Sequence, residues 1–275
     1  MTYPSPLKVV SRKLADNIVI SSSPFKRSNT LNFGARMALF NYGESIVVWS
    51  ALPFGSHILE ALVLLTGQKS SDASSFNVTH LIVPDAEHTM AAKSFKEKFP
   101  EIKILAMENV NIGDGIKPDY VVTEKSGNKV LDKSLLSLEL GLTDPPLVDN
   151  FEFVYLPTHV NRELVAYEKN SKILFEADLL FNLQPKNLEQ FSTATGYSSN
   201  FNPHSGLSFL TRYLRPESSV GRYMFNKIVK SSDPQAKKGL QAIHLWNFDQ
   251  IVMCHGNVIE HGAKAQFERV FRSVL

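Results

Sequence analysis

At four places along the chain, a short apolar run ends at a histidine or an acidic residue. In chain order, LIVP is followed by Asp85, Glu87 and His88, VYLPT by His159, KILFEA by Asp178, and IVMC by His255. Runs of this length, rich in branched apolar residues, are typical of buried β-strands. Side chains at the ends of neighbouring strands can meet at one edge of a sheet, and imidazole with carboxylate suits zinc, iron or manganese. The pattern predicts a β-rich fold with a metal site assembled from four distant segments.

The remaining apolar pattern predicts strands that alternate with a few helices. Strands are expected at 18–20, 37–40, 45–49, 79–83, 102–107, 120–123, 151–156, 163–167, 172–175 and 250–253. Helices are expected at 57–65, 87–99, 234–246 and 262–274. Gly67 is expected to end the first of them. We expect a single domain over 1–275, with an irregular excursion or cap at about 184–220 that is rich in Ser, Asn, Pro and Gly.

Composition narrows the classes of partner. Lys and Arg number 29 against 27 Asp and Glu, and the net charge of +2 is spread without basic clusters, so we expect no nucleic-acid partner. No window approaches the roughly 20 apolar residues of a membrane span. The only cysteine, Cys254, excludes an internal disulfide. These observations favour a cytoplasmic protein with a small-molecule substrate, and the nucleus and the mitochondrion are alternative locations.

The order of these segments resembles the metallo-β-lactamase superfamily. Members of that superfamily place a His-x-His-x-Asp-His motif after a strand, and then a lone histidine, a bridging aspartate and a final histidine. Here VPDAEH (83–88), LPTH (156–159), FEADLLF (175–181) and MCHG (253–256) stand at those places in the same order. The resemblance covers roughly 17–275 and implies an α/β (α+β) fold, a four-layer αββα sandwich, in a divergent branch with an altered metal-binding motif.

The first half of the motif is altered. Matched residue by residue, the first two histidines become Val83 and Asp85, and the motif aspartate becomes Glu87. The motif positions that match outright are His88, His159, Asp178 and His255. In the family, one metal uses the first two histidines and the lone histidine, and the other uses the Asp-His pair, the bridging aspartate and the final histidine.

The resemblance therefore implies one divalent ion, with zinc as the first expectation and iron or manganese as alternatives. Its expected ligands are Glu87, His88, Asp178 and His255. A second ion would have only His159 and Asp178, with a contribution from Asp85, and we do not count on it. No other cofactor is expected.

The implied activity is that of a metal-dependent hydrolase of a small ester, thioester, lactone or phosphoester, in which a metal-bound water becomes hydroxide. Asp85 is the candidate base that orients or deprotonates this water. His159 is the candidate for polarising the substrate or completing the weaker second site.

Plainer interpretations stand beside this one. Asp85 can cap a helix, Glu87 and His88 can be helix-start residues, and Asp178 can pair with an arginine. Two other functions also fit the pattern: a lactamase-like scaffold that has lost catalysis and binds a partner or small molecule, and, with less support, a diiron redox protein. Whether the chain is an enzyme is thus left open, and the occupancy and identity of the ion separate the three functions.

Overall fold

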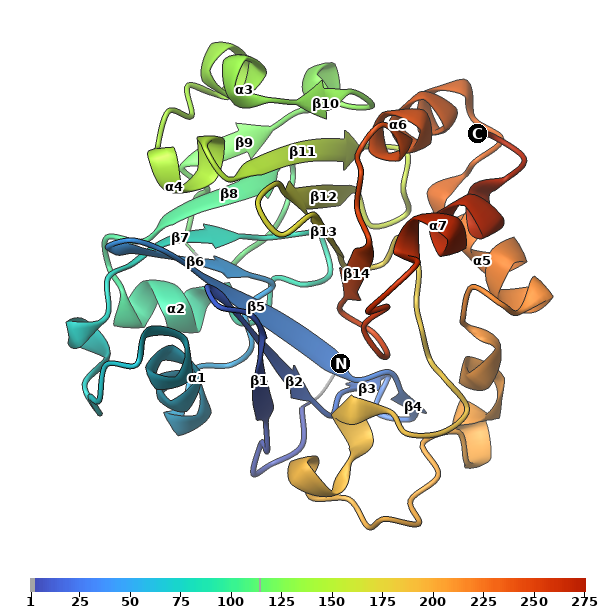
Figure 1. Cartoon of the computed structure of the whole chain (residues 1–275), viewed down its shortest axis with the longest axis horizontal. Coiled ribbons are helices and arrows are strands. Elements are labelled where there is room, and N and C mark those ends of the chain that lie inside the picture. Colours follow the sequence, from blue (N-terminus) through green and yellow to red (C-terminus); the bar gives the residue numbers. More distant parts are fainter. Residues whose placement is uncertain (1–2, 114) are drawn as a thin grey trace.

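The computed structural model describes residues 3–113 and 115–275, and these form two packed β-sheets with helices on both outer faces (Figure 1). The first sheet has seven strands in the order β1-β2-β5-β6-β7-β8-β9, antiparallel from β1 to β6 and parallel from β6 to β9. Its strands are β1 (Val10–Ala15), β2 (Ile18–Ser23), β5 (Ala35–Tyr42), β6 (Ser45–Trp49), β7 (Val78–Ile82), β8 (Lys103–Met107) and β9 (Tyr120–Val122).

The second sheet has five strands in sequence order, antiparallel except for the parallel pair β13-β14. Its strands are β10 (Val130–Leu131), β11 (Phe151–Leu156), β12 (Glu163–Glu168), β13 (Ile173–Glu176) and β14 (Gln250–Met253). A small hairpin of β3 (Lys26–Arg27) and β4 (Leu31–Asn32) lies apart from both sheets. The helices are α1 (Ser56–Thr66), α2 (Ala92–Lys98), α3 (Lys133–Leu140), α4 (Pro145–Val148), α5 (Ser219–Val229), α6 (Pro234–His244) and α7 (Ala263–Phe271).

Alternation along the strands gives each sheet two apolar faces, because successive side chains point to opposite sides. Aromatic rings fill the space between the sheets. Phe40 of the first sheet meets Phe151 and Phe175 of the second at centroid distances of 5.0 and 4.9 Å. Trp49 packs on Phe175 in the same layer. Burial of large rings on both inner faces holds the two sheets together.

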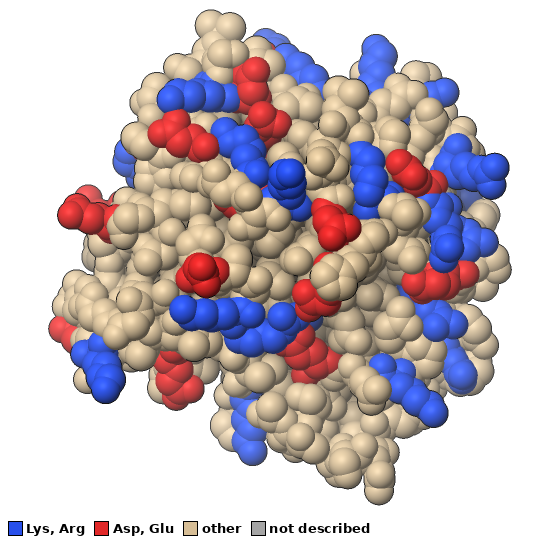
Figure 2. All heavy atoms as spheres, viewed as in Figure 1, with Lys and Arg blue, Asp and Glu red and all other residues tan. Residues whose placement is uncertain are grey.

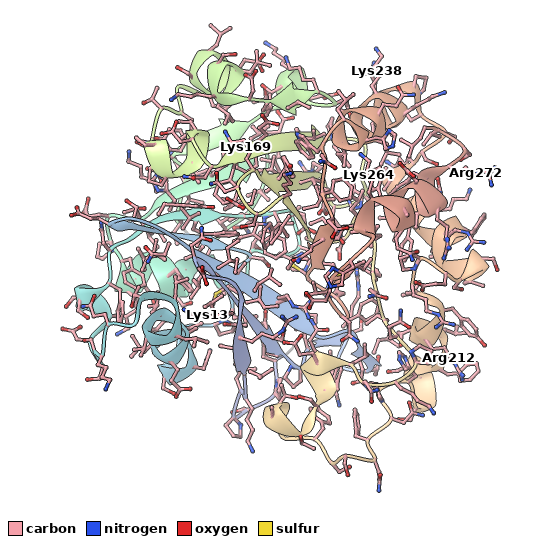
Figure 3. All side chains as sticks on the ribbon, in the orientation of Figure 1. Lys13, Lys169, Arg212, Lys238, Lys264 and Arg272 are labelled. Atoms are coloured by element: carbon pink, nitrogen blue, oxygen red, sulfur yellow. The ribbon has the colours of Figure 1, made fainter. Side chains whose placement is uncertain are left out.

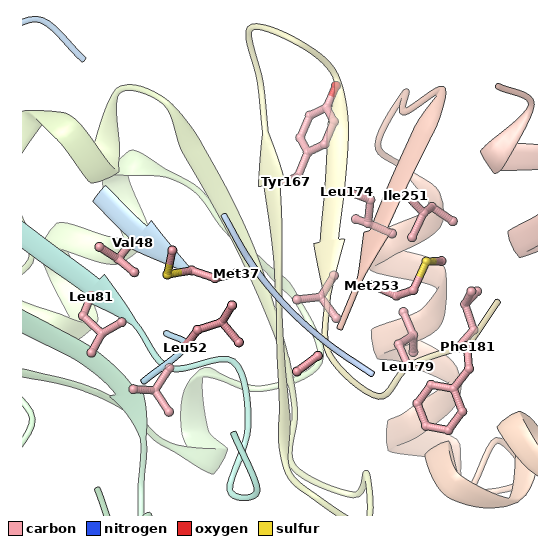
Figure 4. Close-up of a cluster of buried hydrophobic side chains, with 14 of the residues drawn as sticks. Met37, Val48, Leu52, Leu81, Tyr167, Leu174, Leu179, Phe181, Ile251 and Met253 are labelled. Carbon is pink, nitrogen blue, oxygen red and sulfur yellow. The ribbon is translucent and has the colours of Figure 1, made fainter. Parts of the chain in front are cut away.

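The outer faces form a second apolar cluster (Figure 4). Val48 and Leu81 lie on the outer side of the first sheet, toward α1 and α2. Leu174 and Ile251 lie on the outer side of the second sheet, where α6 packs on β11 and α7 packs on β14. The layers therefore run helix, sheet, sheet, helix, which confirms the expected four-layer sandwich.

The strands expected at 45–49, 151–156 and 250–253 have those bounds, and α1 ends at Gly67 in the left-handed conformation. The helix expected at 87–99 is wrong in its first part, because α2 begins only at Ala92. Before it, Oδ1 of Asp85 accepts hydrogen bonds from the backbone N–H groups of Glu87 and His88, both at 2.8 Å. This side chain closes a turn that competes with the helix.

The excursion at 184–220 contains three short 3₁₀ helices and leads directly into α5, which was not expected. These helices are η3 (Glu189–Phe191), η4 (Thr193–Thr195) and η5 (Gly206–Tyr213). None of the helices in the described parts of the chain is long and apolar enough to cross a membrane. Figure 2 shows acidic and basic side chains interspersed over the visible face, and the basic residues labelled in Figure 3 belong to different elements rather than one patch.

One polar cluster outside the apolar layers joins the parallel strands β7, β8 and β9 to α4. Oδ2 of Asp144 accepts hydrogen bonds from Nε2 of His80 at 2.9 Å and from the Tyr120 hydroxyl at 2.6 Å. Nζ of Lys103 lies 2.9 Å from the same oxygen. Burial raises the pKa of the Asp144 carboxyl, but these three hydrogen bonds outweigh it and lower the pKa to about 2. Burial lowers the pKa of His80, so at neutral pH the charged partner of Asp144 is Lys103.

The Asp144 cluster predicts a pH-dependent stability. A carboxyl with a depressed pKa adds stability that is present above its unfolded pKa and is lost as pH falls through its folded pKa. Asp144→Asn should therefore lower the free energy of unfolding by about 1 kcal/mol near neutral pH, because solvent screens this partly exposed cluster, and by much less as pH approaches about 2. Urea unfolding of both proteins across this range measures the difference. A constant difference over the whole range would contradict the assignment.

Candidate metal centre

Three of the expected ligands converge at one edge of the sandwich. A ligand atom from each of His88, Asp178 and His255 lies within 4.8 Å of the other two. Asp178 and His255 meet because β13 and β14 are parallel neighbours with Glu176 opposite Met253, so the chain leaves both strands at the same edge. His88 arrives from the first sheet, in the turn that follows β7.

Hydrogen bonds orient both imidazoles. Nδ1 of His255 lies 2.8 Å from the carbonyl oxygen of Gly34, and Nδ1 of His88 lies 2.9 Å from Oδ1 of Asp85. A carbonyl can only accept, so Nδ1 of His255 carries the proton and Nε2 presents a lone pair. Nδ1–H donation to Asp85 leaves Nε2 of His88 as the ligand atom in the same way. An imidazole held by an acceptor behind it is the usual form of a metal-binding histidine.

Asp178 supplies the third donor. Its Oδ2 accepts a hydrogen bond from Nδ2 of Asn161 at 2.5 Å. Its Oδ1 lies 3.2 Å from Nε2 of His255 and, within the described residues, is a buried oxygen without a hydrogen-bond partner. A buried carboxylate oxygen this close to imidazole nitrogens is stabilised either by a proton on a ring nitrogen or by a cation between them. Ligands of a tetrahedral zinc ion stand about 3.4 Å apart, so the spacing fits an ion.

The pKa values of two ionisable groups in the centre differ strongly from their usual values. Burial raises the pKa of the Asp178 carboxyl, but the imidazoles of His255 and His88 outweigh it and hold the pKa well below its usual range. Burial lowers the pKa of His88, but the Asp85 carboxylate outweighs it and raises the pKa well above its usual value. The centre therefore combines an ionised carboxylate with an imidazole that would have to release a proton before it could bind a metal ion.

Glu87, expected among the ligands, lies outside the group of three ligand atoms. The Asp85 turn explains the difference, because it uses the backbone N–H groups of Glu87 and His88 and directs only His88 toward Asp178 and His255. The side chain of Glu87 instead lines the cavity beside the centre.

His159 was expected as a ligand or polarising group, and the structure gives both of its ring nitrogens other partners. Nε2 lies 3.3 Å from the carbonyl oxygen of Asp178, and Nδ1 accepts from the backbone N–H of Asn161 at 3.2 Å. Burial lowers the pKa of His159, so the ring is neutral. The imidazole supports the Asp178 turn from behind, with no lone pair left for an ion.

Sequence reasoning missed two supports of Asp178. Asn161 fixes its carboxylate, as described above. Glu163 is fully buried and accepts from the backbone N–H groups of Ala177 at 2.5 Å and Asp178 at 3.1 Å. The sequence did hold a sign of them, because Asn161 and Glu163 are polar residues within four positions of His159.

A small cavity opens beside the three ligands, with a volume of about 30 Å³. Its walls are mainly apolar: Tyr3, Phe25, Phe33, Ala35, Ala51, Met90 and Ala91, with Arg27 and Glu87 as the charged residues apart from the ligands. A cavity of roughly 10–15 Å³ can hold one water molecule, so this cavity has room for one or two waters. Phe33 and Phe25 also pack on the His255 ring, at centroid distances of 5.4 and 6.4 Å.

Several solved structures have an overall fold similar to that of this chain. A metallo-β-lactamase from Pontibacter korlensis superposes with a TM-score of 0.55 at 13% identity, covering 97% of this chain and 99% of that one. The chain has a metallo-β-lactamase-like fold. A metallo-β-lactamase from Pseudomonas aeruginosa in its mono-zinc form gives a TM-score of 0.53 at 11% identity, covering 97% and 95%.

A mutant flavo di-iron protein from Thermotoga maritima gives a TM-score of 0.58 at 14% identity, and the match covers 98% of this chain but 63% of that protein. No protein-family model and no curated protein matches the sequence. Identities this low establish the metallo-β-lactamase-like fold alone. Within that fold, the site of this chain rests on its own residues.

Proposed function

We propose that this protein is a metal-dependent hydrolase with one divalent ion held by His88, Asp178 and His255. The observation that carries the proposal is that a ligand atom from each of these three side chains lies within 4.8 Å of the other two, while the Nδ1 atoms of both imidazoles are already hydrogen-bonded. The fold is shared with metallo-β-lactamases, one of them described in a mono-zinc form. Two nitrogens and one oxygen make zinc the first choice.

We propose one ion rather than two because of the side chains that remain able to act as ligands. Both ring nitrogens of His159 are engaged within the protein, so His159 does not join Asp178 as a ligand of a second ion. When bound, the ion would lower the pKa of a coordinated water and supply hydroxide at neutral pH. Asn161 holds the Asp178 carboxylate, and Asp85 holds the ring of His88, so neither ligand has to reorient during the reaction.

The structure changes our choice of proton acceptor. Asp85 does not line the cavity, and its Oδ1 already bonds to the turn and to His88. Glu87 does line the cavity. We therefore assign Glu87 as the carboxylate that takes a proton from water there, and Asp85 as a positioning residue. Substrates of this site are small esters, thioesters, lactones or phosphoesters of which only the reacting carbonyl or phosphoryl group enters the cavity, because the cavity has room for one or two waters.

Elemental analysis of the purified protein tests the proposal, with His88→Ala and His255→Ala beside the wild type. We expect about one ion per wild-type chain, loss of the ion in both variants, and loss of hydrolysis of small esters and lactones. The matched control is His57→Ala, because Nε2 of His57 bonds to the carbonyl oxygen of Pro53 instead of facing the centre. An empty site after reconstitution would favour the non-catalytic scaffold, and two irons would favour redox chemistry.

A further inference from the structure

One side chain of the excursion at 184–220 contacts the backbone that carries the metal ligand His255. Gln190, in η3, is fully buried. Its Nε2 donates to the carbonyl oxygen of Cys254 at 2.8 Å, and its Oε1 accepts from the backbone N–H of Gly256 at 2.9 Å. These two groups flank His255, so one amide grips the backbone on both sides of a metal ligand.

The neighbouring backbone groups of this segment are also engaged. Nη1 of Arg36 donates to the carbonyl oxygen of Met253 at 2.6 Å, and the backbone N–H of Asn182 donates to the carbonyl oxygen of His255 at 3.2 Å. Arg36 is itself buried, and Nη2 lies 3.7 Å from Oε2 of Glu189 in η3. The segment 253–256 is therefore fixed by groups from β5, from the excursion and from the turn after β13.

Gln190 also packs against the acceptor behind the His255 ring. The side chain of Gln190 occupies the position that a Cβ at residue 34 would take, so Gly34 lets it approach the backbone closely. The carbonyl oxygen of the same Gly34 accepts from Nδ1 of His255. Gln190 thus contacts both the backbone that carries His255 and the group that fixes its ring.

We propose that Gln190 is a positioning residue of the metal centre, and that the excursion acts as an arm that holds His255 in place. This inference rests on the proposed function for its effect on metal binding. The amide suits the task, because it is a donor and an acceptor at once and adds no charge beside the site. Groups that orient a ligand from behind typically contribute about 10- to 100-fold to metal affinity.

The experiment compares the zinc affinity of the wild type with that of Gln190→Met, by competition with a chromophoric chelator. Met keeps the volume but loses both hydrogen bonds, and we expect affinity to fall by about 10- to 100-fold. The matched control is Thr195→Val, which removes hydrogen bonds to the carbonyl oxygens of Gln190 and Ser192 in the same segment. Its affinity should stay within about twofold of wild type, because the Gln190 amide is untouched.

A second readout separates this inference from the proposed function. Backbone hydrogen exchange at Gly256, measured without metal, should accelerate by at least about tenfold in Gln190→Met and stay unchanged in Thr195→Val. If the wild type bound no zinc but exchange accelerated, the proposed function would fail and the arm would stand. Unchanged exchange, or wild-type zinc affinity in the variant, would overturn the positioning role. If Gln190→Met does not fold, Gln190→Glu replaces it, because it keeps the acceptor for Gly256 and removes the donor to Cys254.

Discussion

Asp178→Asn is expected to abolish tight zinc binding while the protein stays folded. The Oδ2 position accepts from Nδ2 of Asn161, so the oxygen of the new amide must stay there. The amide nitrogen then replaces Oδ1 and points two protons at the place where the ion would sit. Loss of the charge together with this donor should weaken zinc binding by about 1,000-fold or more, roughly 4 kcal/mol.

Zinc titration with a competing chelator measures this effect, and circular dichroism checks the fold. Asp149→Asn is the matched control, because Asp149 is exposed and its carboxylate pairs with Lys133 at the surface, away from the three ligands. It should bind zinc like the wild type. An Asp178→Asn protein that retained the ion at full affinity would rule out this carboxylate as a ligand.

Glu163→Leu is expected to be the most destabilising of the substitutions considered. The variant leaves the backbone N–H groups of Ala177 and Asp178 buried without acceptors, and each such group costs about 1–3 kcal/mol. The free energy of unfolding should fall by about 3–5 kcal/mol. Glu163→Gln keeps one acceptor, and its loss should be about half as large.

Urea unfolding of the metal-free proteins measures both losses. Glu139→Leu is the control, since this exposed residue interacts with Lys129 and Ser126 and accepts from no buried backbone N–H group among the described residues. It should change stability by less than about 1 kcal/mol. Equal stability of Glu163→Leu and the control would mean that the Asp178 turn does not depend on Glu163.

The strands could be predicted because they follow from short apolar runs, a local property, whereas the layer order was implied by the resemblance to the metallo-β-lactamase superfamily. The candidate ligands that follow β7, β13 and β14 were identified for the same reason, since each comes a few positions after a short run rich in apolar residues. Helix α3 also had readable signals: Asp132 caps its start by accepting from the backbone N–H of Leu135, and Gly141 ends it in the left-handed conformation. Leu135, Leu136 and Leu140 pack against the core, but the exposed Leu138 interrupts this pattern in the sequence, so the helix was missed.

The roles within the site could not be read in this way, because they depend on hydrogen bonds between distant segments. Spacing alone could not show that both ring nitrogens of His159 form hydrogen bonds, one with Asp178 and one with Asn161. Nor does any local pattern connect Gly34 or Gln190 with His255. The position of Glu87 was missed for a different reason: the turn closed by Asp85 competes with the helix that the apolar spacing favours.

The parallel pairing of β13 with β14 determines when the site can form during folding. Asp178 and His255 stand at the ends of these adjacent strands, yet the excursion, α5 and α6 separate them in the chain. Parallel strands so far apart require closure of a long loop, and such contacts form late and slowly. An ion at this centre would therefore act on the rate of unfolding, since it holds together a junction that the folding transition state has not yet made.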